Sequence, residues 1–224
     1  MTTTTRVHLV RHGATVLSAE DRFAGATDVE LSDEGRRQVA CLGERLAAEP
    51  IVHVYASPMR RTLDTATAIA TPHRLVPTAN AALREIDHGR WDGLTRREVA
   101  QQHPDEAEAW EIDPFTFAPQ GGEAGVQVMA RALPALRELV ERHLGHTIVV
   151  VSHKATIRLL LCALLGVDAR GYRDRLDQSP ACLNTLDFRD AVHARLVSFN
   201  DVSHYTPCPL PVGPRLSPMW DGRE

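Results

Sequence analysis

Short apolar runs rich in β-branched residues alternate along the chain with longer stretches of helical character. The apolar runs cover residues 7–10, 52–56, 147–151, 185–188 and 195–199. The helical stretches cover residues 32–48, 57–70, 96–102, 105–112, 124–143 and 154–165. This alternation predicts an α/β domain with a mostly parallel sheet. The run at 147–151 contains only apolar or β-branched residues, which is typical of a central strand buried on both faces.

Residue types at several helix ends support these boundaries. Ser32 is predicted to cap a helix whose first turn carries two acidic residues, beside the positive end of the helix dipole. The pair Ser57-Pro58 is predicted to start the next helix, because proline at the first helical position sacrifices no hydrogen bond. Pro134 is expected to bend the long helix that contains it.

The middle and the end of the chain depart from this regular pattern. Residues from about 86 to 122 are predicted to form an insertion beside the α/β core, and such segments often carry the surfaces that select a substrate. Residues 205–224 contain five prolines, so we expect an extended tail there. The sequence therefore predicts one domain over residues 1–204, followed by the tail.

Composition and charge exclude several classes of protein. A chain of 224 residues with 43% hydrophobic and 24% charged residues fits a single globular domain. The net charge of −4 and the lack of an Arg- or Lys-rich stripe argue against a nucleic-acid partner. No apolar run is long enough to span a membrane, and the N-terminus does not resemble a signal peptide. The four cysteines lack metal or redox spacing, so we expect a cytoplasmic protein with reduced thiols.

Two of the predicted strands each lead to a histidine. His12 follows the run at 7–10, and His153 follows the run at 147–151. Ligands of open parallel sheets bind outside the carboxyl ends of the strands, so the two imidazoles are expected to share one pocket. Gly13 allows the backbone to turn sharply and to approach a ligand closely. The alternative is that each histidine simply ends a strand.

Two arginines favour an anion as the ligand. Arg11 precedes His12, and Arg61 follows the predicted strand at 52–56. Guanidinium groups stay charged and match phosphate oxygens bidentately. Since the protein as a whole is acidic, a local cluster of arginines is needed to bind an anionic substrate. The alternative, a solvated surface arginine, fits Arg11 poorly because it follows a buried strand directly.

These residues belong to motifs that resemble the signature of the histidine phosphatase (phosphoglycerate mutase-like) superfamily, branch 1. Residues 11–13 with Thr15 are similar to the R-H-G-x-T motif of that superfamily. Further matching segments follow in the expected order between residues 25 and 204. They are Gly25 with Asp28, Leu31, Ser32 and Gly35, then Ser57-Pro58 with Arg61, Thr65 and Ala66, then Leu83-Arg84-Glu85-Ile86, Gly89 with Trp91 and Gly93, Gly121-Gly122-Glu123, Ser152-His153, and Asn200-Asp201 with His204.

The resemblance implies a three-layer α/β/α fold with a mostly parallel central sheet and a small helical cap insertion. It implies that His12 attacks phosphorus and forms a phosphohistidine that water cleaves. Arg11, Arg61 and His153 would then neutralise charge in the transition state. Glu85 would donate a proton to the leaving oxygen. No metal and no cofactor is implied.

The same resemblance supplies expectations for substrate binding. The expected contacts of the phosphorylated substrate are Gly13, Thr15, Ser18 and Lys154. This chain departs from the family pattern at Ala14, Ser18, Ala124 and Lys154, where the family commonly has Glu or Gln, Asn, Ser and Gly. The bulky cation of Lys154 would narrow the pocket or bind a second anionic group. For the proton donor, Asp87 and Glu123 are weaker matches than Glu85.

The length of the insertion favours hydrolysis of a small phosphorylated metabolite. Only 35 residues separate Glu85 from Gly121, fewer than in mutases of similar sequence. A shorter cap admits water more freely, and residues 94–119 within it are expected to decide the substrate. The alternatives are phosphoglycerate mutase activity and a non-catalytic relative that binds phosphorylated ligands. A metal-dependent hydrolase is disfavoured because the chain has no H-E-x-x-H motif, and a homodimer is left open.

Overall fold

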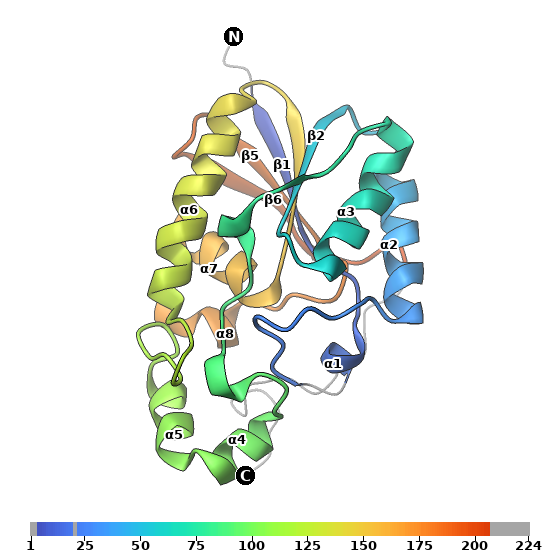
Figure 1. Cartoon of the computed structure of the whole chain (residues 1–224). Coiled ribbons are helices and arrows are strands. Elements are labelled where there is room, and N and C mark those ends of the chain that lie inside the picture. Colours follow the sequence, from blue (N-terminus) through green and yellow to red (C-terminus); the bar gives the residue numbers. More distant parts are fainter. Residues whose placement is uncertain (1–3, 20–21, 207–224) are drawn as a thin grey trace.

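A six-stranded sheet forms the middle layer of the molecule (Figure 1). The computed structural model describes residues 4–19 and 22–206. The strand order is β3-β2-β4-β1-β5-β6. The strands are β1 (Thr5–Arg11), β2 (Ile51–Ala56), β3 (Thr78–Ala79), β4 (Thr147–Ser152), β5 (Leu183–Phe188) and β6 (Ala194–Asp201).

The first four strands run parallel, and the last two are antiparallel to their neighbours. β4 pairs in parallel with β1 on one side and with β2 on the other, and β3 pairs in parallel with β2. β5 and β6 add two antiparallel strands at the other edge. The prediction of a mostly parallel α/β sheet is therefore confirmed. Residues Ile148 to Val151 of the central strand are fully buried, as expected for a strand covered on both faces.

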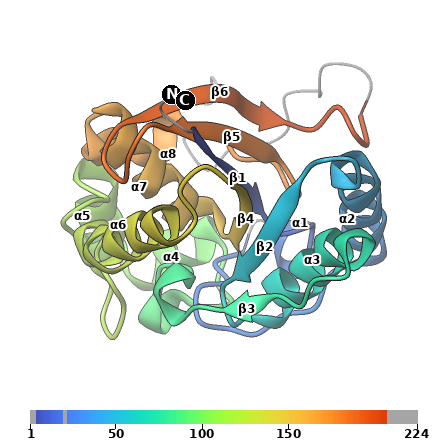
Figure 2. The ribbon, with the colours of Figure 1, turned by 90° about the horizontal axis from the view of Figure 1, so that it is seen from above.

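Helices cover both faces of the sheet, which gives the predicted three layers (Figure 2). One face packs against α6 and α7, where Leu136, Leu139 and Leu160 meet the strands. The other face packs against α2 and α3, where Leu42 and Ile69 are buried. The helices are α1 (Val16–Ala19), α2 (Asp33–Leu46), α3 (Arg60–Ala70), α4 (Arg96–Gln102), α5 (Pro104–Ile112), α6 (Gly125–Arg142), α7 (Lys154–Leu165) and α8 (Tyr172–Arg175), with short 3-10 turns at Thr71–His73, Ala81–Leu83, Gly89–Trp91 and Ala169–Gly171.

One predicted helix start is wrong, and the reason lies in the site. α2 begins as expected, with the Ser32 side chain accepting a hydrogen bond from the Gly35 amide. α3, however, begins at Arg60 rather than at Ser57-Pro58. The Arg60 amide donates to the Asp28 carboxylate (2.8 Å), which caps the helix from another segment. Ser57 thus stays outside the helix, and its hydroxyl bonds to a buried histidine instead.

The segment between β3 and α6 carries α4 and α5 at the carboxyl end of the parallel strands (Figure 1). Its small core is aromatic and is built from Phe23, Trp91 and Trp110 with Val99. α6 runs without a break through Pro134. Of the predicted tail, only Tyr205 and Thr206 lie within the described residues. No helix among residues 4–19 and 22–206 is long and apolar enough to cross a membrane.

Candidate active site

The backbone of His12 is fixed on both sides at the end of β1. Its amide donates to the Ser152 carbonyl (3.1 Å) at the end of β4. Its carbonyl accepts from the Ala181 amide (3.0 Å) in the loop before β5. The side chain is only 6% exposed. The sheet and the loop before β5 therefore fix the backbone from which the imidazole projects.

Local hydrogen bonding determines which nitrogen of His12 can react. Nδ1 lies 2.7 Å from the Gly13 carbonyl oxygen. Because a carbonyl only accepts, Nδ1 carries the hydrogen and Nε2 keeps its lone pair. Burial, together with the charges of Arg11 and Arg61, holds the pKa of His12 well below its ordinary value. His12 is therefore a neutral imidazole with a free Nε2, as an attacking nitrogen requires.

Gly13 lies at a close approach between the turn and α2. A Cβ at this position would come within 2.8 Å of the Gly35 carbonyl oxygen and 2.7 Å of a Val39 methyl group. The Gly13 amide donates to the Thr65 hydroxyl of α3 (3.2 Å). Only glycine therefore fits where the turn after His12 meets these helices.

His153 lies beside His12, at the end of β4. The two ring centroids are 5.2 Å apart in an edge-on arrangement. Arg61 Nε donates to His153 Nδ1 (3.3 Å), so the ring hydrogen is on Nε2, which bonds to the Ser57 hydroxyl (2.8 Å). Burial, followed by the charge of Arg61, lowers the pKa of His153 well below its ordinary value. The expected pair of imidazoles at one sheet edge is present.

Arg61 is almost fully buried, with 1% exposed, and is held by backbone carbonyls. Its Nη1 donates to Thr27 O (2.8 Å), and its Nη2 donates to Ala24 O (3.0 Å) and Gly25 O (3.2 Å). The amides of Gly25, Ala26 and Thr27 in turn donate to the carboxylate of Asp92. Sequence reasoning identified Arg61 but missed Asp92, which organises the segment that holds it.

Arg11 has a buried donor that meets no acceptor in the described protein. Its Nη1 donates to Gln178 O (2.6 Å), whereas its Nε is buried without a partner among those residues. Leaving a guanidinium N–H unbonded inside a protein is costly. An anionic ligand would supply the missing acceptor, so the arginine is suited to bind an oxyanion.

Glu85 is held at the N-terminus of α7. Its carboxylate accepts from the Ala155 and Thr156 amides (each 3.1 Å) and from the Thr156 hydroxyl (3.1 Å). Burial lowers the pKa values of Arg11 and Arg61, and the charge of Glu85 opposes this shift in both. Ala155 and Thr156 closely follow His153 along the chain, so their amide bonds place the carboxylate next to the start of α7. The carboxyl group thus lies beside the cationic histidine–arginine cluster, partly open to solvent.

The remaining residues predicted to contact the substrate lie on two helices, α1 with its preceding turn and α7. Thr15 and Ser18 bond to each other across the first turn of α1, where each amide donates to the other's hydroxyl. The Ser18 hydroxyl also donates to Thr15 O (2.8 Å), so its hydrogen serves the turn in this structure. Lys154 is the first residue of α7, directly after His153.

The alternative carboxylates have other partners. Asp87 accepts from the Gly89 amide (2.8 Å), and Glu123 forms an ion pair with Arg131 (2.8 Å). Neither therefore takes the place of Glu85 beside the histidines. Among the residues that the structure describes, there is no group of three or more His, Cys, Asp or Glu side chains able to hold a metal ion.

Comparison with known proteins identifies relatives over nearly the whole described chain. Residues 7–202 match the profile of the histidine phosphatase superfamily (branch 1). Phosphoserine phosphatase 1 of Hydrogenobacter thermophilus is 38% identical over 160 residues, which are 71% of this chain and 76% of that protein. Glucosyl-3-phosphoglycerate phosphatase of Mycolicibacterium vanbaalenii is 36% identical over 169 residues, which are 72% of this chain and 75% of that protein.

Solved structures agree with these sequence matches. Bacillus stearothermophilus YhfR superposes with a TM-score of 0.83 at 30% identity, covering 89% of this chain and 98% of that one. The native structure of mycobacterial glucosyl-3-phosphoglycerate phosphatase gives a TM-score of 0.80 at 31% identity, covering 88% and 99%. The arrangement of layers described above is therefore that of these proteins.

Proposed function

Because this chain belongs to the histidine phosphatase superfamily (branch 1), we propose that it hydrolyses small phosphomonoesters through a phosphohistidine formed on His12, without a metal ion. The observation that carries this proposal is the state of His12. Its Nδ1 is committed to the Gly13 carbonyl, and its imidazole is kept neutral by burial and two arginines. Its Nε2 lone pair is therefore ready to attack phosphorus.

In the first step, His12 Nε2 forms a bond to phosphorus while the bond between phosphorus and the ester oxygen breaks. Arg11 and Arg61 donate to the phosphoryl oxygens, on which negative charge is spread in the transition state. His153 joins them by turning its Nε2 hydrogen from the Ser57 hydroxyl to a phosphoryl oxygen. Glu85, in its protonated form, gives its proton to the leaving oxygen, and the alcohol departs.

In the second step, water attacks the phosphohistidine. The Glu85 carboxylate takes a proton from the water as the oxygen bonds to phosphorus. The bond between phosphorus and nitrogen breaks, and its electron pair returns to Nε2. Inorganic phosphate leaves, and both His12 and Glu85 regain their starting forms. The donors around Glu85 from α7 stabilise the anion that this step needs.

The substrate is proposed to be a phosphomonoester that also carries a carboxylate. Two relatives are named for phosphoserine and for glucosyl-3-phosphoglycerate, and both of these compounds have a carboxylate near the phosphate. We assign contacts with the substrate to Gly13, Thr15, Ser18 and Lys154. Of these, the ammonium group of Lys154 is the one suited to the second anionic group.

The proposal is tested by phosphate release from a panel of phosphomonoesters with chelator present. Phosphoserine, glucosyl-3-phosphoglycerate, 3-phosphoglycerate and p-nitrophenyl phosphate make up the panel, and His12→Ala is measured beside the wild type. Turnover that resists chelator and is absent from the variant is expected, with a base-stable, acid-labile phosphoryl group trapped on the wild type. Isomerisation of 3-phosphoglycerate without phosphate release would identify a mutase, and binding without turnover on any ester would identify a non-catalytic relative.

A further inference from the structure

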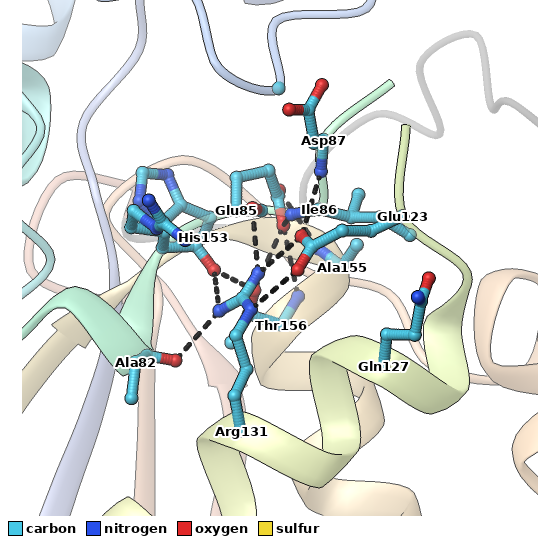
Figure 3. A network of polar contacts seen from close by, with 12 residues as sticks. Ala82, Glu85, Ile86, Asp87, Glu123, Gln127, Arg131, His153, Ala155 and Thr156 are labelled. Atoms are coloured by element: carbon cyan, nitrogen blue, oxygen red, sulfur yellow. Dashed lines mark hydrogen bonds and ion pairs between the residues drawn. The ribbon is translucent and has the colours of Figure 1, made fainter. Parts of the chain in front are cut away.

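Arg131, in the middle of α6, reaches the backbone of the segment that carries Glu85 (Figure 3). Its Nη1 donates to Ala82 O (2.8 Å) and Arg84 O (2.8 Å). Its Nη2 donates to Glu85 O (3.0 Å). A guanidinium group has a planar, fixed arrangement of donors. Three carbonyls that bond to one such group are therefore held in a fixed relation to α6.

Glu123 holds the same segment on the far side of Glu85. It receives two bonds from Arg131, from Nε to Oε1 (3.0 Å) and from Nη2 to Oε2 (2.8 Å). Its Oε2 also accepts from the Asp87 amide (3.2 Å), and its own amide donates to Asp87 O (2.8 Å). Burial raises the pKa of Glu123, but the bonds and the charge of Arg131, together with the Asp87 amide and the charge of Arg84, lower the pKa overall. Glu123 is therefore a charged partner that fixes both Arg131 and residue 87.

The side chain of Glu85 is fixed separately, by α7. The Thr156 amide donates to Glu85 Oε1 (3.1 Å). The single hydrogen of the Thr156 hydroxyl is shared between Arg84 O (2.7 Å) and Glu85 Oε1 (3.1 Å). The carboxyl group is thus tied to α7, and its backbone is tied to α6 through Arg131. A shift of the backbone would draw the carboxyl group away from the donors on α7 and from its place beside the phosphoryl site.

We propose that Arg131 is a positioning residue for proton transfer by Glu85, and that its ion pair with Glu123 completes this function. The inference rests on the proposed role of Glu85 as the acid. Arg131 is 18% exposed at its side chain, and its bonds described here go to the Glu85 segment and to Glu123 rather than to the phosphoryl site. It acts on the reaction through the placement of another residue.

Leaving groups of different basicity distinguish this role from a general structural one. An alkyl alcohol is a poor leaving group and needs a proton as its bond to phosphorus breaks. A p-nitrophenolate leaves easily and depends little on an acid. Misplacing Glu85 therefore lowers kcat/KM, which reports formation of the phosphohistidine, more for alkyl esters than for aryl esters. Hydrolysis of the phosphohistidine, in which Glu85 is the base, is common to all esters and affects kcat alone. General loosening of the site lowers kcat/KM equally for both esters.

The first experiment compares kcat/KM of Arg131→Lys on phosphoserine, or on the best alkyl phosphate of the panel, with kcat/KM on p-nitrophenyl phosphate. Lysine keeps the charge but cannot bond to three carbonyls and a carboxylate together. We expect kcat/KM for the alkyl ester to fall about tenfold or more, since small misplacements of a reacting group are costly. For the aryl ester, kcat/KM is expected to change less than about threefold. Arg142→Lys, in the exposed Arg142–Glu138 pair of the same helix, is the matched control and should change neither rate.

A double-mutant comparison gives the decisive result. Glu85→Gln is expected to lower kcat/KM selectively for the alkyl ester, and adding Arg131→Lys to it should change kcat/KM less than about twofold, because the positioned acid is already absent. Equal losses of kcat/KM on both esters in Arg131→Lys, or full additivity, would overturn the role of Arg131 while leaving Glu85 as the acid. If Glu85→Gln itself lowers kcat/KM equally for both esters, the proposed acid is wrong, and the inference fails with it.

Glu123→Gln provides the same test in a chain that retains Arg131. The amide keeps one oxygen for hydrogen bonding but loses the charge and the bidentate bond. A selective loss on the alkyl ester, smaller than that of Arg131→Lys, is expected. An unchanged ratio of the two rates in a folded Glu123→Gln protein would contradict the proposed role of the ion pair.

Discussion

His12 and His153 follow neighbouring strands of the sheet, whereas Glu85 stands in a loop outside it. The backbone of His12 is held by main-chain bonds at its amide and at its carbonyl. The backbone of Glu85 is held by the Arg131 side chain from α6, and its carboxylate by the amide and hydroxyl of Thr156 from α7. Where the fold itself supplies the geometry, few single residues control it. Where side chains supply it, one substitution can change it.

Mutation of the nucleophile is expected to have the largest effect, because it removes the group that attacks phosphorus. His12→Ala should lower phosphate release on the order of 10⁴-fold or more, as loss of a covalent nucleophile does elsewhere. His193→Ala removes an exposed histidine between β5 and β6 and serves as the control. Appreciable turnover by His12→Ala on all esters would mean that another group attacks phosphorus.

Arg11 and Arg61, beside the histidines, are expected to matter equally for catalysis but differently for stability. Arg61→Met and Arg11→Met should each lower kcat by roughly 10²–10³-fold, because each removes charge from the transition state. Arg61→Met also leaves the carbonyls of Ala24, Gly25 and Thr27 without their donor, so it should lower the free energy of unfolding by about 3 kcal/mol or more. Arg11 has a buried Nε without a partner among the described residues, so its loss should destabilise less. Urea denaturation of both variants measures the difference, and equal destabilisation would contradict this account.

Acid is expected to destabilise the protein through β1, because this strand carries a buried histidine, His8. Burial, aided by Arg6 and Arg45, lowers the pKa of His8 from 6.5 to about 4. The unfolded chain therefore binds the proton more readily, so stability from this residue is complete above pH 6.5 and falls as pH drops toward 4. The loss at pH 4 is about 3 kcal/mol from this residue.

His8→Gln tests this pH dependence. Glutamine has no charge to gain, so the fall in the urea midpoint between pH 7 and pH 4.5 should be smaller in the variant than in the wild type. His193→Ala again provides the control for an exposed histidine. If His8→Gln follows the wild-type pH profile, the acid sensitivity arises elsewhere, for example at His12 and His153, whose pKa values are also lowered.

The smallest expected effect comes from the loop that supports His12. Ala181, whose amide donates to the His12 carbonyl, has a φ of 52°, which is strained for a residue with a side chain. Ala181→Gly relieves this strain, but it also removes a fully buried methyl group and frees the unfolded chain, so the free energy of unfolding should change by less than about 1 kcal/mol. Gly166→Ala, at φ 68° with open space around its Cβ, introduces strain without adding a buried contact, so it should lower the free energy of unfolding by about 1 kcal/mol.

The same contrast explains how much of the fold could be predicted. β1 and β4 are strongly apolar, and the helix over 154–165 ends at a glycine, so their bounds differ from the predicted ones by no more than two residues. β3 has only two residues and α1 only four, which is too short for any period to appear. The start of α3 was misplaced because Ser57 has the residue type of a helix cap but bonds to His153, a contact between positions 96 residues apart.

The residues of the candidate site also differ in whether the sequence could predict them. His12 and His153 could be paired from strand ends alone, because parallel strands bring their carboxyl ends to one edge. Glu85 was identified only through family resemblance, since nothing in its own loop marks it. Arg131 and Asp92 were not identified at all. Arg131 lies 46 residues from the Glu85 carbonyl that it binds, and Asp92 acts on a segment more than 60 residues earlier, so no local pattern reveals either partner.

The position of Asp92 also limits which segment of the chain can be exchanged with that of a relative. Its carboxylate organises the segment that holds Arg61, and Glu123 at the other end of the cap binds Arg131. A chimera that exchanges residues 94–119 for those of a relative keeps both junctions, and with them the phosphoryl site. A graft that extends to either carboxylate would exchange substrate preference and catalytic geometry together. Either graft must also supply partners for Arg22 and Arg173, which pair with Glu98 and Glu111 inside the exchanged segment.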